Sequence, residues 1–183
     1  MKEGGISIPT SYTSTIAPIS SNKVFNEIRN LGNPGDASSH AVGFETGYVV
    51  RVAWHQMLGE PKDLFTFDHP NKDDPIDNRR QGSCSWVVQE PGMLHGFGGY
   101  FDCKLYKDVH ISINPPTFST GMFSWFQMFF PINAPVYLNK GDTIETIFWR
   151  CVSDKKVFYE WALTSPRISK IHNCNGKHYW IGL

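Results

Sequence analysis

The sequence predicts a mainly β fold, an antiparallel β-barrel or sandwich with one short N-terminal helix and a loop excursion after it. Aromatic residues make up 14% of the chain, and such residues favour the pleated, half-buried surface of a sheet. Hydrophobic side chains alternate with period two in several segments. Turn signals separate these segments at short intervals, without internal repeats or βαβ alternation. The 183 residues therefore fit a single domain, 1–183.

Residues 20–46 hold the predicted helix and the excursion. Residues 33–46 are rich in Gly, Ser and Asn, which indicates an exposed, arm-like loop. The helix itself is predicted from two possible N-capping serines, an apolar face at helical spacing and a C-terminal glycine. These residues are Ser20, Ser21, Val24, Ile28, Leu31 and Gly32.

Period-two alternation predicts the strands. Residues 48–55 place Trp54 on one face with Tyr48, and residues 157–163 place Trp161 on one face with Val157. Residues 94–105 contain three glycines, which suggest a bend or bulge like that at a barrel corner. Further strands are expected at residues 6–8, 12–19, 64–67, 83–88, 109–113, 124–132 and 143–151.

The charge pattern excludes some classes of protein. Seventeen basic residues balance seventeen acidic ones without a run of like charge, which argues against direct nucleic-acid binding. No apolar stretch approaches the roughly 20 residues of a membrane helix, so no membrane contact is expected. The first residues resemble neither a signal nor a transit peptide. A cytoplasmic and nuclear location is therefore expected.

The residues that carry chemistry do not assemble into a complete catalytic site. Residues 67–77 concentrate Asp and His, but they lack the spacing of a calcium loop and fit a turn with solvated charges. No glycine-rich turn for a nucleotide or adenosyl cofactor is present. Glu145 and Glu160 fit the outward-facing positions of strands rather than a catalytic pair. We expect no metal site, no cofactor site and no complete catalytic site within this chain.

The four cysteines are widely separated and lie in or near apolar runs, which is typical of reduced structural thiols. They are Cys84, Cys103, Cys151 and Cys174. Because the chain also has seven histidines, a Cys–His dyad stays open as an alternative.

The most unusual segment is the aromatic run at residues 121–130, which follows a Pro-Pro loop and a Ser-Thr-Gly turn. Its first aromatic residues are therefore expected near a loop tip. Aromatic rings there can stack on a flat cation such as guanidinium, an interaction worth roughly 0.5 to 2 kcal/mol. The alternative is simple core packing of a buried strand.

Many short blocks, in order along nearly the whole chain, resemble the C-terminal region of the type II protein arginine methyltransferases, the arginine N-methyltransferase 5 class. One block would be weak evidence, but so many in register are specific. The blocks are residues 5–9, 12–14, 17–21, 48–51, 65–67, 69–71, 76–78, 94–97, 99–101, 121–126, 148–151, 159–162, 171–173 and 181–183.

The resemblance implies a role for the aromatic run. In this family an adenosylmethionine-binding domain precedes a β-barrel, and the substrate arginine enters between the two. By the match of the barrel loop, Trp125 would stack on the substrate guanidinium, and Phe123 and Ser124 would shape the pocket. The Phe-Ser-Trp form of this loop resembles that of enzymes that make symmetric dimethylarginine.

The resemblance also implies what lies outside the chain. The S-adenosylmethionine site, the loop with two substrate-holding glutamates and the N-terminal domain that recruits a WD-repeat adaptor would all lie upstream. The chain alone is therefore expected to bind no cofactor and to be inactive, as part of a chromatin-regulating methyltransferase of histone and Sm-type tails. Residues 30–46 occupy the region of the family's dimerisation arm, so a homo-oligomer is expected.

Two alternatives of other classes stay open. One is a stand-alone binding module, an aromatic-rich sandwich for sugars or peptides, which would bury its aromatic loop. The other is a hydrolase that uses a cysteine or a metal.

Overall fold

The computed structural model describes residues 5–31 and 41–183, which form antiparallel strands, the helix α1, a short helical segment at residues 41–43 and two 3-10 turns. The elements in chain order are β1 Ser11–Ser20, α1 Asn22–Arg29, β2 Tyr48–Val49, β3 Gln56–Met57, β4 Lys62–Asp68, β5 Arg80–Val87, β6 Gly92–Tyr106, β7 Val109–Ser112, η1 Pro115–Thr117, β8 Met128–Leu138, β9 Thr143–Val152, β10 Lys156–Ser165, η2 Cys174–Gly176 and β11 Ile181–Gly182.

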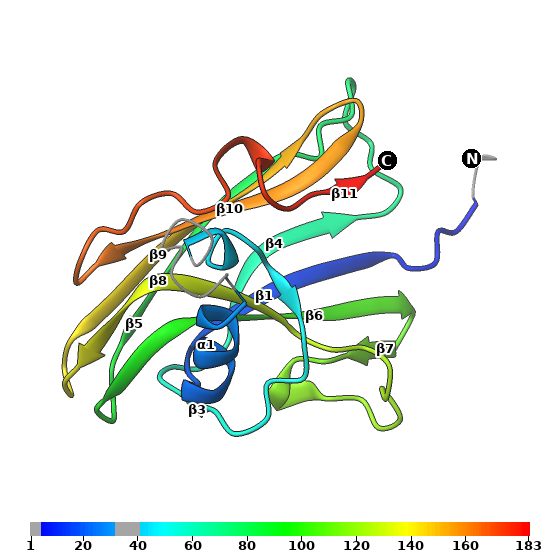
Figure 1. The fold of residues 1–183 in the computed structure, drawn as a ribbon. Coiled ribbons are helices and arrows are strands. Elements are labelled where there is room, and N and C mark those ends of the chain that lie inside the picture. The colour runs from blue at the N-terminus through cyan, green and yellow to red at the C-terminus, as the bar shows by residue number, and fades with distance from the viewer. Residues whose placement is uncertain (1–4, 32–40) are drawn as a thin grey trace.

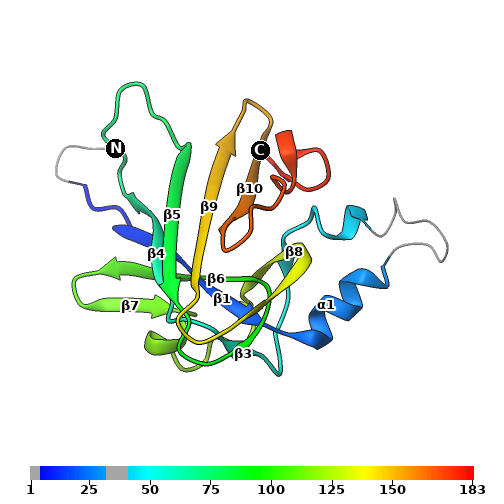
Figure 2. The ribbon, with the colours of Figure 1, turned by 90° about the vertical axis from the view of Figure 1, so that its left-hand side faces the viewer.

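The strands form two sheets, which confirms the predicted mainly β, antiparallel fold. One sheet has seven strands, with the order β2-β8-β6-β1-β3 and with β4 and β7 paired to β1 and β6. The other has four, in the order β11-β10-β9-β5. In Figures 1 and 2 the smaller sheet stands over the larger one. Because no ladder of the described residues joins the two sheets, the architecture is a sandwich, and a closed barrel is not confirmed.

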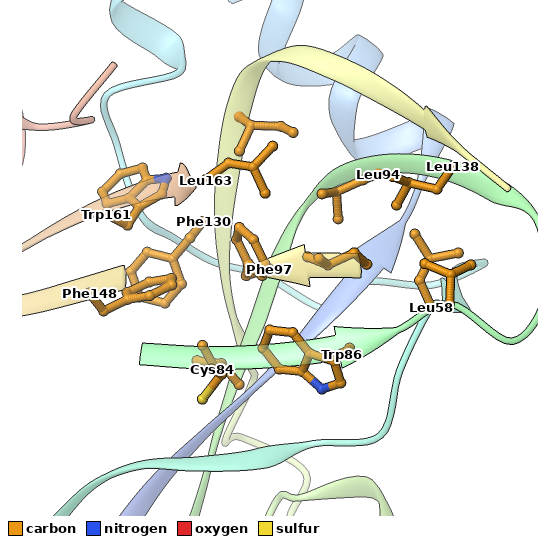
Figure 3. Packing of buried hydrophobic residues seen from close by; sticks show 14 of the residues in the cluster. Leu58, Cys84, Trp86, Leu94, Phe97, Phe130, Leu138, Phe148, Trp161 and Leu163 are labelled. Atoms are coloured by element: carbon orange, nitrogen blue, oxygen red, sulfur yellow. The ribbon is translucent and has the colours of Figure 1, made fainter. Parts of the chain in front are cut away.

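The main core lies between the sheets and is built from side chains at alternate positions of the strands. Figure 3 shows Trp161 and Phe148 from the smaller sheet against Phe130 and Phe97 from the larger one. The ring of Phe130 meets the rings of Phe148 and Trp161 edge-on, at centroid distances of 5.1 and 5.3 Å. The predicted alternation of residues 157–163 is confirmed, since Trp161 is completely buried.

The outer face of the larger sheet is also covered. Ile19 and Phe129 point to that face and pack with Val24 and Ile28 of α1 and with Val52. Because one strand position faces the main core and the next faces this second cluster, β1 and β8 are apolar on both sides.

The C-terminal segment is fastened to the residues that precede β2. The Glu45 carboxylate accepts a hydrogen bond of 2.6 Å from the N–H of Asn173 and forms an ion pair with Lys170. The buried His172 lies 2.9 Å from the carbonyl of Phe44 through Nδ1 and stacks on Trp161. The two hydrogen bonds each join residues that are 128 positions apart in sequence.

The strand predicted at residues 48–55 is wrong beyond Val49. Trp54 has a φ of +59° and its side chain is 87% exposed, so it does not share a buried face with Tyr48. A positive φ breaks the extended backbone that period-two alternation assumes. The segment nevertheless buries Val52.

Other predicted boundaries also shift. Residues 6–8 form no strand, and Ile6 and Ile8 are exposed. The helix begins after Ser21 as expected, but the Ser21 side chain makes no capping bond and Leu31 is exposed beyond the helix end. The predicted C-terminal Gly32 and most of the excursion, residues 33–40, lie outside the described residues.

Candidate functional site

The aromatic run lies where neither β7 nor β8 pairs with the edge of β6. β8 pairs with β6 at residues 92–99, and β7 pairs with the same edge at residues 102–106. Residues 113–127 connect the two strands and therefore leave the sheet at this gap. The predicted strand start at Ser124 is wrong, since β8 begins at Met128. Phe123, Ser124 and Trp125 all lie in the loop.

The base of this loop is fixed by hydrogen bonds to β6. The Asp102 carboxylate accepts bonds of 2.6 Å from the Thr117 hydroxyl and 2.9 Å from the Asn114 amide. Burial would raise the pKa of Asp102, but hydrogen bonding by Ser112, Thr117 and Asn114 outweighs it and holds the pKa below its ordinary value. The N–H of Ile113 also donates to the carbonyl of Phe101 at 3.0 Å.

The three predicted site residues lie together at the loop tip, and all are exposed. Phe123 is 79% exposed, and Trp125 is 58% exposed although one edge contacts Phe101 at a centroid distance of 5.5 Å. Phe101 thus supports one side of the indole while more than half of its surface stays free. This arrangement can offer a flat aromatic face to a planar cation. Core packing, the alternative, describes the end of the run, where Phe129 and Phe130 are buried, but not the exposed Phe123 and Trp125.

The second support of the loop comes from the segment after β2. The guanidinium carbon of Arg51 lies 5.3 Å from the ring centroid of Phe126. The N–H of Val50 donates to the carbonyl of Gln127 at 3.1 Å. The residue next to Trp125 is therefore held by a cation–π contact and a backbone bond close by.

An apolar cavity of about 260 Å³ opens behind the loop, between the two sheets. Phe126 and Met128 form its wall on the loop side, and Tyr12 and Tyr159 line it from β1 and β10. Burial raises the pKa of the Tyr12 phenol. The loop thus stands beside a weakly polar interior, in which charge interactions are less screened than in water.

The alternative chemistries find little support in the described residues. Burial raises the pKa of the Cys84, Cys103 and Cys151 thiols, which is the opposite of nucleophile activation. All four cysteines are free, although Cys174 is exposed in η2 rather than buried in an apolar strand. Within residues 5–31 and 41–183, no three His, Cys, Asp or Glu side chains gather as metal ligands. No helix in the same ranges is long and apolar enough to cross a membrane.

Sequence reasoning proposed the loop tip as the site but did not point to the residues that support the loop. Phe101 and Asp102 fall inside the strand predicted at residues 94–105, and Arg51 falls inside the one predicted at residues 48–55, so none of the three stood out. Their roles depend on the gap between β7 and β8, which no local pattern reveals. Of these supporting residues, Phe126 could have been proposed from the sequence, because it belongs to the aromatic run itself.

The fold is shared with solved structures of arginine methyltransferases. A Trypanosoma brucei PRMT1 enzyme–prozyme heterotetrameric complex with AdoHcy superposes with a TM-score of 0.70 and 14% identity, over 96% of this chain and 56% of that one. A crystal structure of PRMT6 gives a TM-score of 0.56 and 15% identity, over 85% of this chain and 55% of that one. At these identities the likeness concerns the fold.

Sequence comparison gives the family. Residues 11–181 match the model of the PRMT5 oligomerisation domain, and the chain belongs to this family. It is 51% identical, over its whole length, to protein arginine N-methyltransferase 5 of Xenopus laevis and 46% identical to that of Oryza sativa subsp. indica. Protein arginine N-methyltransferase skb1 of Schizosaccharomyces pombe is 34% identical over 97% of the chain. The chain spans only 28% to 31% of the length of these relatives.

Proposed function

We propose that this chain is the substrate-side and oligomerisation domain of a protein arginine N-methyltransferase, a type II enzyme that makes symmetric dimethylarginine from S-adenosylmethionine. The observation that carries the proposal is the half-exposed indole of Trp125, set on a loop whose two ends are fixed. Membership of the PRMT5 oligomerisation domain family supports the same assignment.

The proposed task of Trp125 is to hold the substrate guanidinium by stacking. Phe123 and Ser124 then form the neighbouring wall of the pocket, and Phe126 with Arg51 keeps the loop in place. Methyl transfer needs the donor in line with the attacking nitrogen, so positioning of the guanidinium supplies much of the rate. The other wall, with the S-adenosylmethionine site and two glutamates, belongs to a catalytic domain that precedes this one in the full-length enzyme.

The partners follow from the same proposal. The full-length protein acts as a homo-oligomer on arginine-containing histone and Sm-type tails, in cytoplasm and nucleus, as a chromatin regulator. A WD-repeat adaptor binds its N-terminal domain, and neither membrane nor nucleic acid is a direct partner. The even balance of seventeen basic and seventeen acidic residues supports the last point.

The test is a Trp125→Ala substitution in the full-length enzyme, assayed on an arginine-containing peptide with labelled S-adenosylmethionine. Loss of one cation–π contact should lower kcat/KM by about 2- to 30-fold, and the value for Trp125→Phe should fall between those of the native enzyme and Trp125→Ala. Amino-acid analysis that separates symmetric from asymmetric dimethylarginine identifies the product.

Phe118→Ala is the matched control, since Phe118 is an exposed aromatic residue of the same loop, 56% accessible. It should leave kcat/KM unchanged. Equal losses in the two variants would remove the special role of Trp125. Calorimetry on the 183-residue chain alone should detect no S-adenosylmethionine binding, and micromolar affinity there would contradict the proposed division between two domains.

A further inference from the structure

The cavity of about 260 Å³ between the two sheets is lined by side chains that point inward from both of them. On the larger sheet, Tyr12, Ser14 and Ile16 are alternate residues of β1, and Tyr12 and Ile16 pack with the main core. In the antiparallel register, Gly99 of β6 lies opposite Ile16. Phe101 of β6 likewise lies opposite Ser14. These five residues therefore share the face of the larger sheet that looks toward the smaller one.

The opposite wall of the cavity is aromatic. Phe148 of β9 and Tyr159 of β10 come from the smaller sheet, and the ring of Phe130 meets their rings edge-on at centroid distances of 5.1 and 5.8 Å. Figure 3 shows Phe148 beside Phe130. Among the described residues, no Asp, Glu, Lys, Arg or His lines the cavity. A flat, uncharged ring therefore suits these walls, because aromatic pairs favour edge-to-face and offset contacts.

The volume of the cavity limits the size of such a molecule. An apolar cavity of about 150 Å³ can hold benzene, whereas sites for drug-sized ligands begin at about 300 Å³. The cavity between the sheets, at about 260 Å³, lies between the two and has room for two fused aromatic rings. A charged group placed there would lose its hydration and find no oppositely charged side chain in the described walls. The size and the composition of the walls thus indicate a small neutral molecule.

Three hydroxyl groups supply a polar contact. Tyr12, Ser14 and Tyr159 are partly exposed, and no described residue forms a hydrogen bond with their hydroxyl groups. Burial raises the pKa of the Tyr12 phenol, so this hydroxyl stays protonated near neutral pH and can donate. A few polar groups in an otherwise apolar site fix the orientation of a ligand. The molecule should therefore carry one hydrogen-bond acceptor.

We propose that this cavity binds a small neutral molecule made of two fused aromatic rings with one hydrogen-bond acceptor. Several wall residues are partly exposed, among them Phe126 at 39%, so the molecule can enter without unfolding of the chain. It contacts Phe101, whose ring meets the Trp125 indole edge-on at a centroid distance of 5.5 Å. The occupant thus reaches the aromatic loop from behind and leaves the free face of Trp125 open. The site is separate from that face and does not depend on the proposed methyltransferase role.

The test is a titration of the 183-residue chain with quinoline near neutral pH, with 13C in the Ile and Met methyl groups and 15N in the indoles. Quinoline has two fused aromatic rings, one acceptor nitrogen and no charge at this pH. The methyl signals of Ile16 and Met128 and the indole N–H signal of Trp125 should shift in a saturable way. The signals of Ile181 and Trp180, which are half-exposed and do not line the cavity, should stay unchanged.

Ser14→Ile places a larger apolar side chain in the cavity and should weaken quinoline binding at least about tenfold. Thr13→Ile is the matched control, because it makes a similar change in the same strand on the opposite face, where the Thr13 hydroxyl lies 3.0 Å from that of Thr66. It should leave the affinity unchanged. Backbone spectra like those of the native chain establish that both variants fold. Full quinoline affinity in Ser14→Ile would overturn the cavity site.

N-Methylquinolinium separates the cavity from the exposed loop tip in the native chain. It keeps the two rings but carries a positive charge and no free acceptor, so it should bind the cavity at least about tenfold more weakly than quinoline. A flat cation can still stack on Trp125, which would shift the indole signal without those of Ile16 and Met128. Equal affinities of the two molecules at Ile16 and Met128 would overturn the neutral site, and so would a quinoline response confined to Trp125.

Discussion

At the scale of single residues, Asp102 holds the start of the loop that carries Trp125. Its carboxylate binds Thr117 and Asn114 at the start of the loop, and the loop then passes η1 before it reaches the aromatic tip. Asp102 therefore acts as a positioning residue for the proposed substrate contact. Its effect can be measured as stability and as loop mobility.

Asp102→Ala should destabilise the chain by about 1 to 3 kcal/mol, because it leaves two donors near the buried Asn114 without their acceptor. Asp102→Asn should cost less, since one acceptor oxygen stays. Urea unfolding at neutral pH measures both. Asp108→Asn, which changes an exposed carboxylate in the turn between β6 and β7, is the control and should be neutral.

The pH dependence of the unfolding free energy tests the role of the Asp102 carboxylate, because the direction of its pKa shift fixes the direction of the effect. The folded pKa of Asp102 lies below its ordinary value, so the folded state favours the ionised form. This contribution is present above the unfolded pKa, near 3.9, and is lost as the pH falls through the folded pKa. The stability gap between the native chain and Asp102→Asn should therefore narrow below about pH 4. A gap that widens there would contradict the assignment.

At the scale of elements, β6 owes its shape to glycines. A Cβ at Gly96 would lie 2.3 Å from the carbonyl oxygen of Phe130 and 2.9 Å from the ring of Phe129. The register between β6 and β8 shifts at this point, between Leu94 and Gly96. The glycine thus lets β8 approach β6 closely at a bulge.

Gly96→Ala should therefore destabilise the chain by roughly 1 to 3 kcal/mol, since the obstructing atom is backbone and cannot rotate away. Gly182→Ala is the control, because a Cβ there meets nothing within 4 Å, and its effect should stay within about 0.5 kcal/mol. Thermal unfolding monitored by circular dichroism compares the two. Equal melting temperatures would show that β8 can move away without cost.

The same strands show how far sequence patterns reach. The bulge in β6 was expected from its three glycines and is confirmed by the register shift. The end of β8 was not expected, because the strand was predicted to end at residue 132, whereas it continues through Pro135 to Leu138. The prediction that placed Trp54 in a strand was wrong for another reason. The hydrophobic alternation of the sequence gives no sign that Trp54 has a φ of +59°. Local sequence patterns predict which face of a strand is buried, whereas the ends of strands and the pairing between strands depend on contacts with residues far away in the sequence.

At the scale of the whole molecule, side chains rather than ladders join the two sheets. On one side, β4 and β5 are connected by the Lys62 ammonium, which donates to the carbonyl of Ser85 at 2.6 Å. On the other side, the indole N–H of Trp161 donates to the carbonyl of Pro131 at 2.8 Å. Sheets that meet in this way can keep an interior cavity, such as the one behind the Trp125 loop.

The Trp161 bond gives the last prediction. Trp161 is completely buried, and Phe cannot donate to Pro131, so Trp161→Phe leaves a buried carbonyl without its partner and a small cavity. We expect a loss of about 1 to 3 kcal/mol from the missing bond, and cavity formation should add to it. Trp149→Phe is the matched control, because its indole donates to Gln81 in an exposed bond within the same sheet and should cost about 0.5 kcal/mol or less. Equal losses of unfolding free energy in the two variants would mean that the size of the indole matters more than the bond between the sheets. A larger loss in Trp161→Phe would mean that the hydrogen bond between β10 and β8 stabilises the sandwich.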